Sequence, residues 1–99
     1  MIDAMTACQE FEPHVGTDFT IIGSDPAIVL TLIEAKQLKS TGVADGLRAP
    51  FSLLFQSTDA RVLQQQTFGL EHPAMGANEI FLVPVAQNLT GIQYEATFN

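Results

Sequence analysis

The sequence contains few charged residues, one cysteine and no tryptophan. Charged residues make up 15% of the chain, against about 25% in an average soluble domain. Cys8 cannot form an internal disulfide, and we expect it to be a small apolar residue on a helix. No segment approaches the roughly 18–20 apolar residues of a membrane span, and the N-terminus does not resemble a signal peptide. We expect no membrane insertion and, by default, a cytoplasmic protein, with extracellular assembly by a non-classical route as the alternative.

Basic residues are scarce, and they are confined to the middle of the chain. There are four Lys and Arg against 11 Asp and Glu, which gives a net charge of −7. The four are Lys36, Lys39, Arg48 and Arg61. Without a basic patch and interleaved aromatic residues, the chain should not bind nucleic acid or an anionic membrane surface.

The longest apolar run is Ile80–Ala86, IFLVPVA, and its length and β-branched content favour a buried strand over a helix. Because side chains alternate, Phe81, Val83 and Val85 share one face, and the even-numbered residues share the other. Both faces are apolar, so we expect both to be covered. Pro84 has no N–H for a ladder and belongs at a bulge or an edge. Either another part of the chain or a neighbouring subunit covers it. In the second case the interface residues are Ile80, Leu82, Val83, Pro84 and Val85.

The residues before this run predict a hairpin. In Thr67–His72, TFGLEH, alternate residues Phe68, Leu70 and His72 share one side. Pro73 and Gly76 favour a turn. We predict a β-hairpin over residues 67–85 with a loop of about six residues.

The remaining segments are short and separated by turns. A helix is expected over residues 6–13, where Thr6 and Gln9 fit a capping box and Phe11 faces the core. Further strands are predicted at 18–22, 27–38, 51–57 and 93–98. No connection is long enough for a helical crossover, so the pairing should be mostly antiparallel. The expected fold is mostly β: a small antiparallel β-sandwich or partly open β-barrel of about six strands, with one short N-terminal helix. Residues 1–99 should form a single domain.

A serine hydrolase would need an activated nucleophile, and the sequence around the best candidate serine does not fit one. Ser52, His72 and Asp59 could be combined into a triad. The local sequence around Ser52 is Pro-Phe-Ser-Leu-Leu, which lacks the glycines of a nucleophile elbow. We therefore expect no catalytic residue and no enzymatic activity.

Two histidines could bind a metal with nearby acids, but their spacing is unlike a metal motif. His14 and His72, with Glu12 or Glu71, show neither His-x-His nor His-x-x-x-His spacing. We expect His72 to hydrogen-bond a backbone group at a strand end and His14 to cap the short helix. No metal and no cofactor are predicted.

One arginine and a set of three aromatic rings can each be interpreted in two ways. Arg48 could form a bidentate ion pair with Glu71 or Glu95, or remain a solvated loop residue. Arg48, Glu71 and His72 are thus the polar residues expected to have structural roles. The rings of Tyr94, Phe81 and Phe98 could bind carbohydrate, but alternation favours an inward, core position for them.

Five motifs are spread along most of the chain. They are Val15–Phe19 (VGTDF), Arg48–Phe55 (RAPFSLLF), Glu71–Gly76 (EHPAMG), Phe81–Val85 (FLVPV) and Tyr94–Asn99 (YEATFN). Together they resemble a short bacterial family filed as domain of unknown function 6916, over about Phe11 to Asn99. That family has no established activity, so the resemblance assigns no catalytic residue. It implies a gene that sits beside genes for phage-tail-collar-like proteins, which favours a structural or assembly role over catalysis.

The low charge, the two-faced apolar run and the resemblance favour a non-enzymatic structural or assembly protein. It would be a β-sandwich subunit or adaptor of an extracellular filament or phage-tail-like assembly, which pairs with itself or with a tail-collar-like neighbour. The alternative is a monomeric accessory or chaperone-like binding module for a neighbouring protein. A small hydrolase is the distant third hypothesis.

Overall fold

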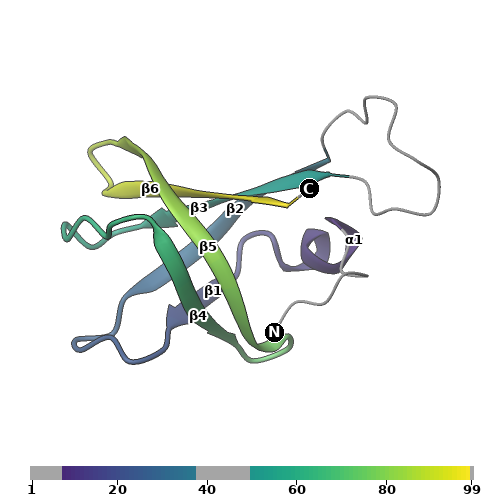
Figure 1. Ribbon diagram of the computed structural model, residues 1–99, viewed down its shortest axis with the longest axis horizontal. Coiled ribbons are helices and arrows are strands. Elements are labelled where there is room, and N and C mark those ends of the chain that lie inside the picture. Colours follow the sequence, from purple (N-terminus) through teal and green to yellow (C-terminus); the bar gives the residue numbers. More distant parts are fainter. Residues whose placement is uncertain (1–7, 38–49, 99) are drawn as a thin grey trace.

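Six antiparallel strands contain more than half of the residues described by a computed structural model, which are residues 8–37 and 50–98. Figure 1 shows these strands wound around one another, with a short helical segment at one end. The helical segment is a single α-turn, α1 (Cys8–Phe11), followed by a 3-10 turn, η1 (Glu12–His14). The strands are β1 (Asp18–Ile21), β2 (Val29–Gln37), β3 (Phe51–Ser57), β4 (Gln66–His72), β5 (Gly76–Gln87) and β6 (Ile92–Phe98).

The sheet closes on itself in the order β1-β2-β3-β6-β5-β4, and every neighbouring pair is antiparallel. The predicted mostly-β, six-stranded antiparallel fold is confirmed. Of the two predicted architectures, a sandwich or a partly open barrel, the structure has the barrel, and this barrel is closed rather than partly open. The short strand β1 makes the closure, because it pairs with β2 on one side and β4 on the other. Thr20 stands opposite both Val29 and Glu71. Each described strand therefore has a neighbour on both sides, although β5 extends beyond its pairing with β4 and β2 extends beyond its pairing with β1.

Alternate side chains fill the interior, as the strand period of two requires. On β3, Phe51, Leu53 and Phe55 are all fully buried, and Ser52 and Leu54 are half-exposed between them. Each large apolar side chain that is buried in this way contributes about 1.5–3 kcal/mol to folding. The other fully buried members of the core are Phe11, Phe19, Leu30, Leu32, Leu70, Leu82, Tyr94 and Ala96.

The N-terminal turns cover one end of the barrel. The ring of Phe11 lies 5.9 Å from that of Phe51 and 6.0 Å from that of Phe98. Cys8 is buried beside it, and burial followed by the nearby Glu12 carboxylate raises the pKa of its thiol. Cys8 and Phe11 therefore have the apolar core roles expected of them. Of the predicted capping box, Thr6 lies outside the described residues.

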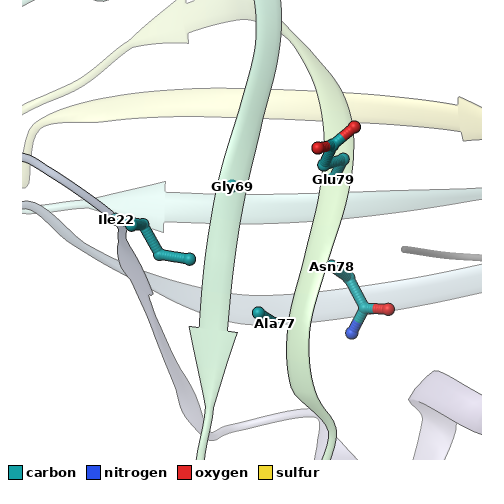
Figure 2. Close-up of a pocket in the computed structure, with 5 residues that line it drawn as sticks. All are labelled: Ile22, Gly69, Ala77, Asn78 and Glu79. Carbon is teal, nitrogen blue, oxygen red and sulfur yellow. The ribbon is translucent and has the colours of Figure 1, made fainter.

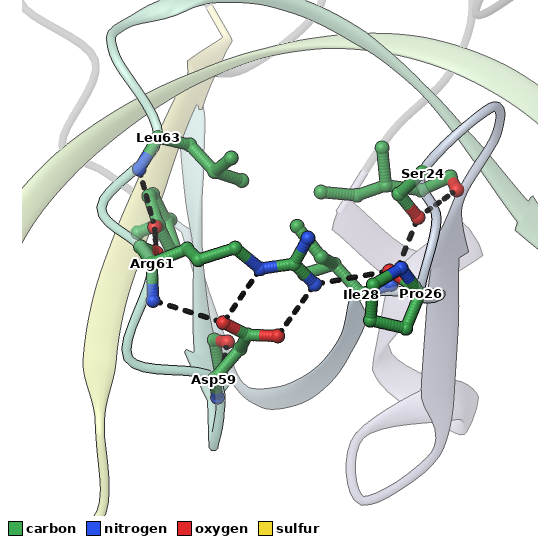
Figure 3. Close-up of polar contacts among 9 residues, drawn as sticks. Ser24, Pro26, Ile28, Asp59, Arg61 and Leu63 are labelled. Atoms are coloured by element: carbon green, nitrogen blue, oxygen red, sulfur yellow. Dashed lines mark hydrogen bonds and ion pairs between the residues drawn. The ribbon is translucent and has the colours of Figure 1, made fainter.

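The opposite end is closed by the segment between β3 and β4. The Leu63 N–H donates to the Tyr94 hydroxyl at 3.0 Å, and the Arg61 side chain donates to the carbonyl of Pro26 at 3.0 Å (Figure 3). Arg61 also forms an ion pair with Asp59 at 2.7 Å. Hydrogen bonds from the Arg61 side chain and backbone lower the pKa of Asp59 to about 2. These contacts tie the β3–β4 connection to the β1–β2 turn and to the core tyrosine.

The β4–β5 hairpin is tighter than predicted. The strands end at His72 and resume at Gly76, so the loop is Pro73–Met75 rather than about six residues. Gly76 has a positive φ of 75°, a conformation that glycine adopts without steric cost. The longer estimate assigned residues 76–78 to the loop, although they pair with residues 70–72 of β4.

Candidate functional site

The outer face of β5 carries an exposed apolar strip made of Phe81, Val83 and Val85. Phe81 is 50% exposed and Val85 is 48% exposed, and Val83 is half-buried between them. The alternating neighbours Ile80 and Leu82 are 1% and 0% exposed. The division of this strand into two faces is therefore as predicted. The outer face is about half exposed in the single chain, so its cover by a neighbouring subunit, one of the two predicted alternatives, stays a prediction. We call these three residues the β5 strip.

Pro84 lies at a bulge, which was one of its two predicted positions. The register between β5 and β6 shifts between Pro84 and Ala86, so Val85 has no direct partner across the ladder. A bulge tolerates proline because the ladder is already interrupted there. On its other side, β5 pairs with β4 only as far as Leu82. The end of the β5 strip therefore lies where the sheet is least continuous.

Of the five residues proposed as an interface, two are buried in the core and three are accessible. Ile80 and Leu82 point into the core and cannot reach a partner while the barrel is folded. Val83, Pro84 and Val85 are at least partly accessible. Phe81, which was assigned an inward core position together with Tyr94 and Phe98, instead points outward. Tyr94 is fully buried as predicted, and Phe98 packs against the core.

A depression of about 320 Å³ adjoins the β5 strip, over Gly69 on β4. Figure 2 shows the side chain of Ile22 pointing toward β4 near Gly69, with Ala77 and Glu79 on the adjacent strand. A Cβ on Gly69 would lie 3.3 Å from Cδ1 of Ile22, so the glycine leaves the space that Ile22 occupies. Thr67, the next outward residue of β4, pairs with Phe81. The depression and the strip thus lie at successive outward positions of β4 and β5.

This surface is acidic at its edges. Glu79 precedes Phe81 by two residues on β5, Glu95 stands directly opposite Val83 on β6, and Glu71 is opposite Ala77. All three glutamates are exposed, and residues 62–99 contain no Lys or Arg. Within residues 8–37 and 50–98, the ion pair that forms is Asp59–Arg61, so the three carboxylates are not neutralised by a described cation.

A second cluster surrounds His72 at the end of β4. His72 is buried, and its ring lies 4.7 Å from the ring of His14 and 4.5 Å from that of Phe19. Its Nδ1 accepts hydrogen bonds from the backbone N–H groups of Ala74 and Met75, at 3.0 and 3.2 Å. The predicted bond to backbone at a strand end is therefore confirmed, and it shapes the β4–β5 turn.

The partners of His72 define which nitrogen carries the proton. Because Nδ1 accepts from two N–H groups, Nε2 holds the proton and donates it to Oγ1 of Thr17 at 2.9 Å. That hydroxyl in turn donates to the carbonyl of His14. Burial and then the neighbouring His14 imidazole lower the pKa of His72. The cluster is a neutral hydrogen-bonded brace between η1, β1 and the hairpin.

The triad considered from the sequence is not assembled. The polar partners of His72 are Thr17 and the hairpin turn, whereas Asp59 binds Arg61 at the other end of the barrel. Ser52 is on the outward side of β3. No group of three or more His, Cys, Asp or Glu residues able to hold a metal occurs among the residues that the structure describes.

Two further sequence predictions concern Arg48 and His14, and two features of the site were missed. Arg48 lies outside the described residues, so its pairing with Glu71 or Glu95 stays a prediction. His14 contributes its carbonyl, not a side-chain cap, to the described contacts, accepting from the N–H and hydroxyl of Thr17. The contact between the His14 and His72 rings was missed, because residues 58 apart in sequence show no local pattern. Gly69, within the alternating run of β4, was the one signal that could have revealed the depression.

The family model described as Domain of unknown function (DUF6916) matches residues 6–98, so the chain belongs to that family. No curated protein and no solved structure matches the chain. Among the described residues, no helix is long and apolar enough to cross a membrane.

Proposed function

We propose that this member of the DUF6916 family is a non-enzymatic assembly protein, a β-barrel subunit or adaptor that packs against another protein through the β5 strip. The observation that carries the proposal is the half-exposure of Phe81 and Val85 on a strand whose inner face already completes the core. Exposed apolar side chains grouped on one face are typical of protein contact sites. The extracellular filament or tail-like assembly expected from the sequence is one setting for this role.

The low charge of the chain also supports packing against protein. Charged residues are depleted at the centres of protein interfaces, where aromatic residues are enriched. The centre of the β5 strip has a phenylalanine and two valines, and its glutamates lie at the sides. This arrangement resembles the apolar core and polar rim of an interface.

A monomeric accessory module for a neighbouring protein is the second candidate function. The net charge of −7 favours it, because every copy of the chain repels every other copy. The two candidates share the same surface and differ in whether the chain also contacts itself.

The test is to purify the chain alone and together with the proteins encoded beside its gene. Light scattering over a concentration series and negative-stain microscopy measure self-assembly, and co-purification measures assembly with a neighbour. We expect an assembly by one of these routes, lost in Val85→Lys. Leu89→Lys is the matched control, because Leu89 is fully exposed on the β5–β6 turn, outside the strip. Assembly that survives Val85→Lys with the fold intact would contradict the proposed surface.

A further inference from the structure

The charges around the β5 strip restrict what can cover it. We propose that its partner is a different protein, whose contact surface has an apolar centre that enters the depression over Gly69 and a rim of Lys or Arg residues. This inference rests on the proposed function and specifies the chemistry of the partner.

The carboxylates lie close enough to select a partner by charge. Residues two apart on a strand are separated by about 6.8 Å, which is the spacing of Glu79 and Phe81. Residues directly opposite across a ladder, as Val83 and Glu95 are, have Cβ atoms about 5 Å apart. Both distances are shorter than the Debye length of about 8 Å at physiological ionic strength. A cation at the rim of the partner would therefore be attracted without strong screening.

A second copy of the chain fits this surface poorly. In a symmetric dimer the same patch meets itself, so the glutamates of one copy would face those of the other. Like charges set against one another at an interface oppose association. The described residues of β4, β5 and β6 offer no Lys or Arg that could neutralise them. Charge complementarity thus favours a basic partner over self-association.

The shape of the surface favours a protruding apolar side chain on that partner. Ile22, Gly69 and Ala77 supply the apolar part of the lining, and Asn78 and Glu79 supply its polar part. Phe81, two residues further along β5, projects beside the depression. A partner that inserts an aliphatic or aromatic side chain here could also stack against the Phe81 ring and place a cation near Glu79.

The experiment is a selection from a library of short random peptides displayed on phage, against the immobilised full chain. We expect the selected peptides to combine apolar residues with Lys or Arg. Phe81→Thr should weaken their binding about tenfold or more. The double variant Glu79→Gln/Glu95→Gln should weaken it by a similar factor and reduce its dependence on salt. Leu89→Thr, on the turn outside the strip, is the control and should leave binding unchanged.

The other outcomes separate the two proposals. Peptides that need Phe81 but lack cations, and that bind the Glu→Gln variant equally well, would overturn the basic partner and leave the β5 strip as an interface. Self-association of the chain that is abolished by Phe81→Thr would identify a second copy as the occupant and would also overturn it. Selected peptides that are insensitive to Phe81→Thr would contradict the surface itself, and the proposed function with it.

Discussion

The two faces of β5 have the same kind of side chain and opposite surroundings. On the inner face, Ile80 and Leu82 are sealed in the core at 1% and 0% exposure, whereas on the outer face Phe81 and Val85 are about half accessible. The inner residues are explained by folding, because a closed barrel of six strands must be filled. The outer residues are not needed for this purpose. Folding therefore explains the inner face of β5 but does not by itself explain the outer face, where we propose that a partner binds.

The largest loss of stability is expected from a substitution in the turn that joins β5 to β6. Gly91 has a φ of 151°, and a Cβ there would lie 1.9 Å from the carbonyl oxygen of Ser57, so the turn must move. Gly91→Ala should lower the free energy of unfolding by about 4 kcal/mol, measured by urea denaturation. Gly23→Ala is the control: its φ is 85° but nothing lies within 4 Å of the new Cβ, so the loss should be about 1 kcal/mol. Equal losses would show that the Ser57 contact is unimportant.

A smaller loss of stability is expected when side-chain volume is removed from the inner face of β5 alone. Leu82→Ala should cost about 3 kcal/mol, because it leaves a cavity in the centre of the barrel. Val85→Ala on the outer face should cost less than about 1 kcal/mol, because half of that side chain is already in water. Thermal unfolding followed by circular dichroism measures both. A Val85 variant as unstable as the Leu82 variant would contradict the division of the strand into two roles.

The His72 brace should produce an effect of intermediate size. His72→Phe keeps a ring in place but leaves the N–H groups of Ala74 and Met75 without their acceptor. The expected cost is about 2 kcal/mol, since water can reach part of the turn. Thr17→Val, which removes only the outer hydroxyl contact, should cost about 1 kcal/mol. A His72→Phe protein as stable as the wild type would show that the hydrogen bonds of His72 do not stabilise the fold.

The same histidine makes stability depend on pH. The pKa of His72 in the folded chain lies below its ordinary value of 6.5, so the unfolded chain takes up the proton first as pH falls. The contribution of His72 is therefore complete above about pH 6.5 and is lost as pH falls toward the folded pKa. Urea unfolding at a series of pH values should show this loss in the wild type, and a weaker one in His72→Phe. An identical pH dependence in the two proteins would assign the loss to other groups.

Much of the strand content could be predicted because it depends on neighbours in sequence. The strand predicted at 51–57 is present, alternation correctly placed Tyr94 in the core, and the missing N–H of Pro84 restricted it to a bulge or an edge, of which the structure has the bulge. Closure could not be predicted, because it depends on the four-residue strand β1 finding two partners far apart in the chain. The outward position of Phe81 was missed for a physical reason. When both faces of a strand are apolar, the pattern gives two faces but not which one the core takes.

If the two faces of β5 have separate roles, the β5 strip is not required for folding. Ile80→Thr and Phe81→Thr make the same new side chain at adjacent positions that face opposite ways, and the measurement is their free energy of unfolding in urea. The account predicts a loss of about 3 kcal/mol for Ile80→Thr, which places a hydroxyl in the core. For Phe81→Thr it predicts a loss below about 1 kcal/mol, because threonine also favours a strand. Equal losses at the two positions would show that folding requires Phe81 as much as Ile80, and would contradict the account.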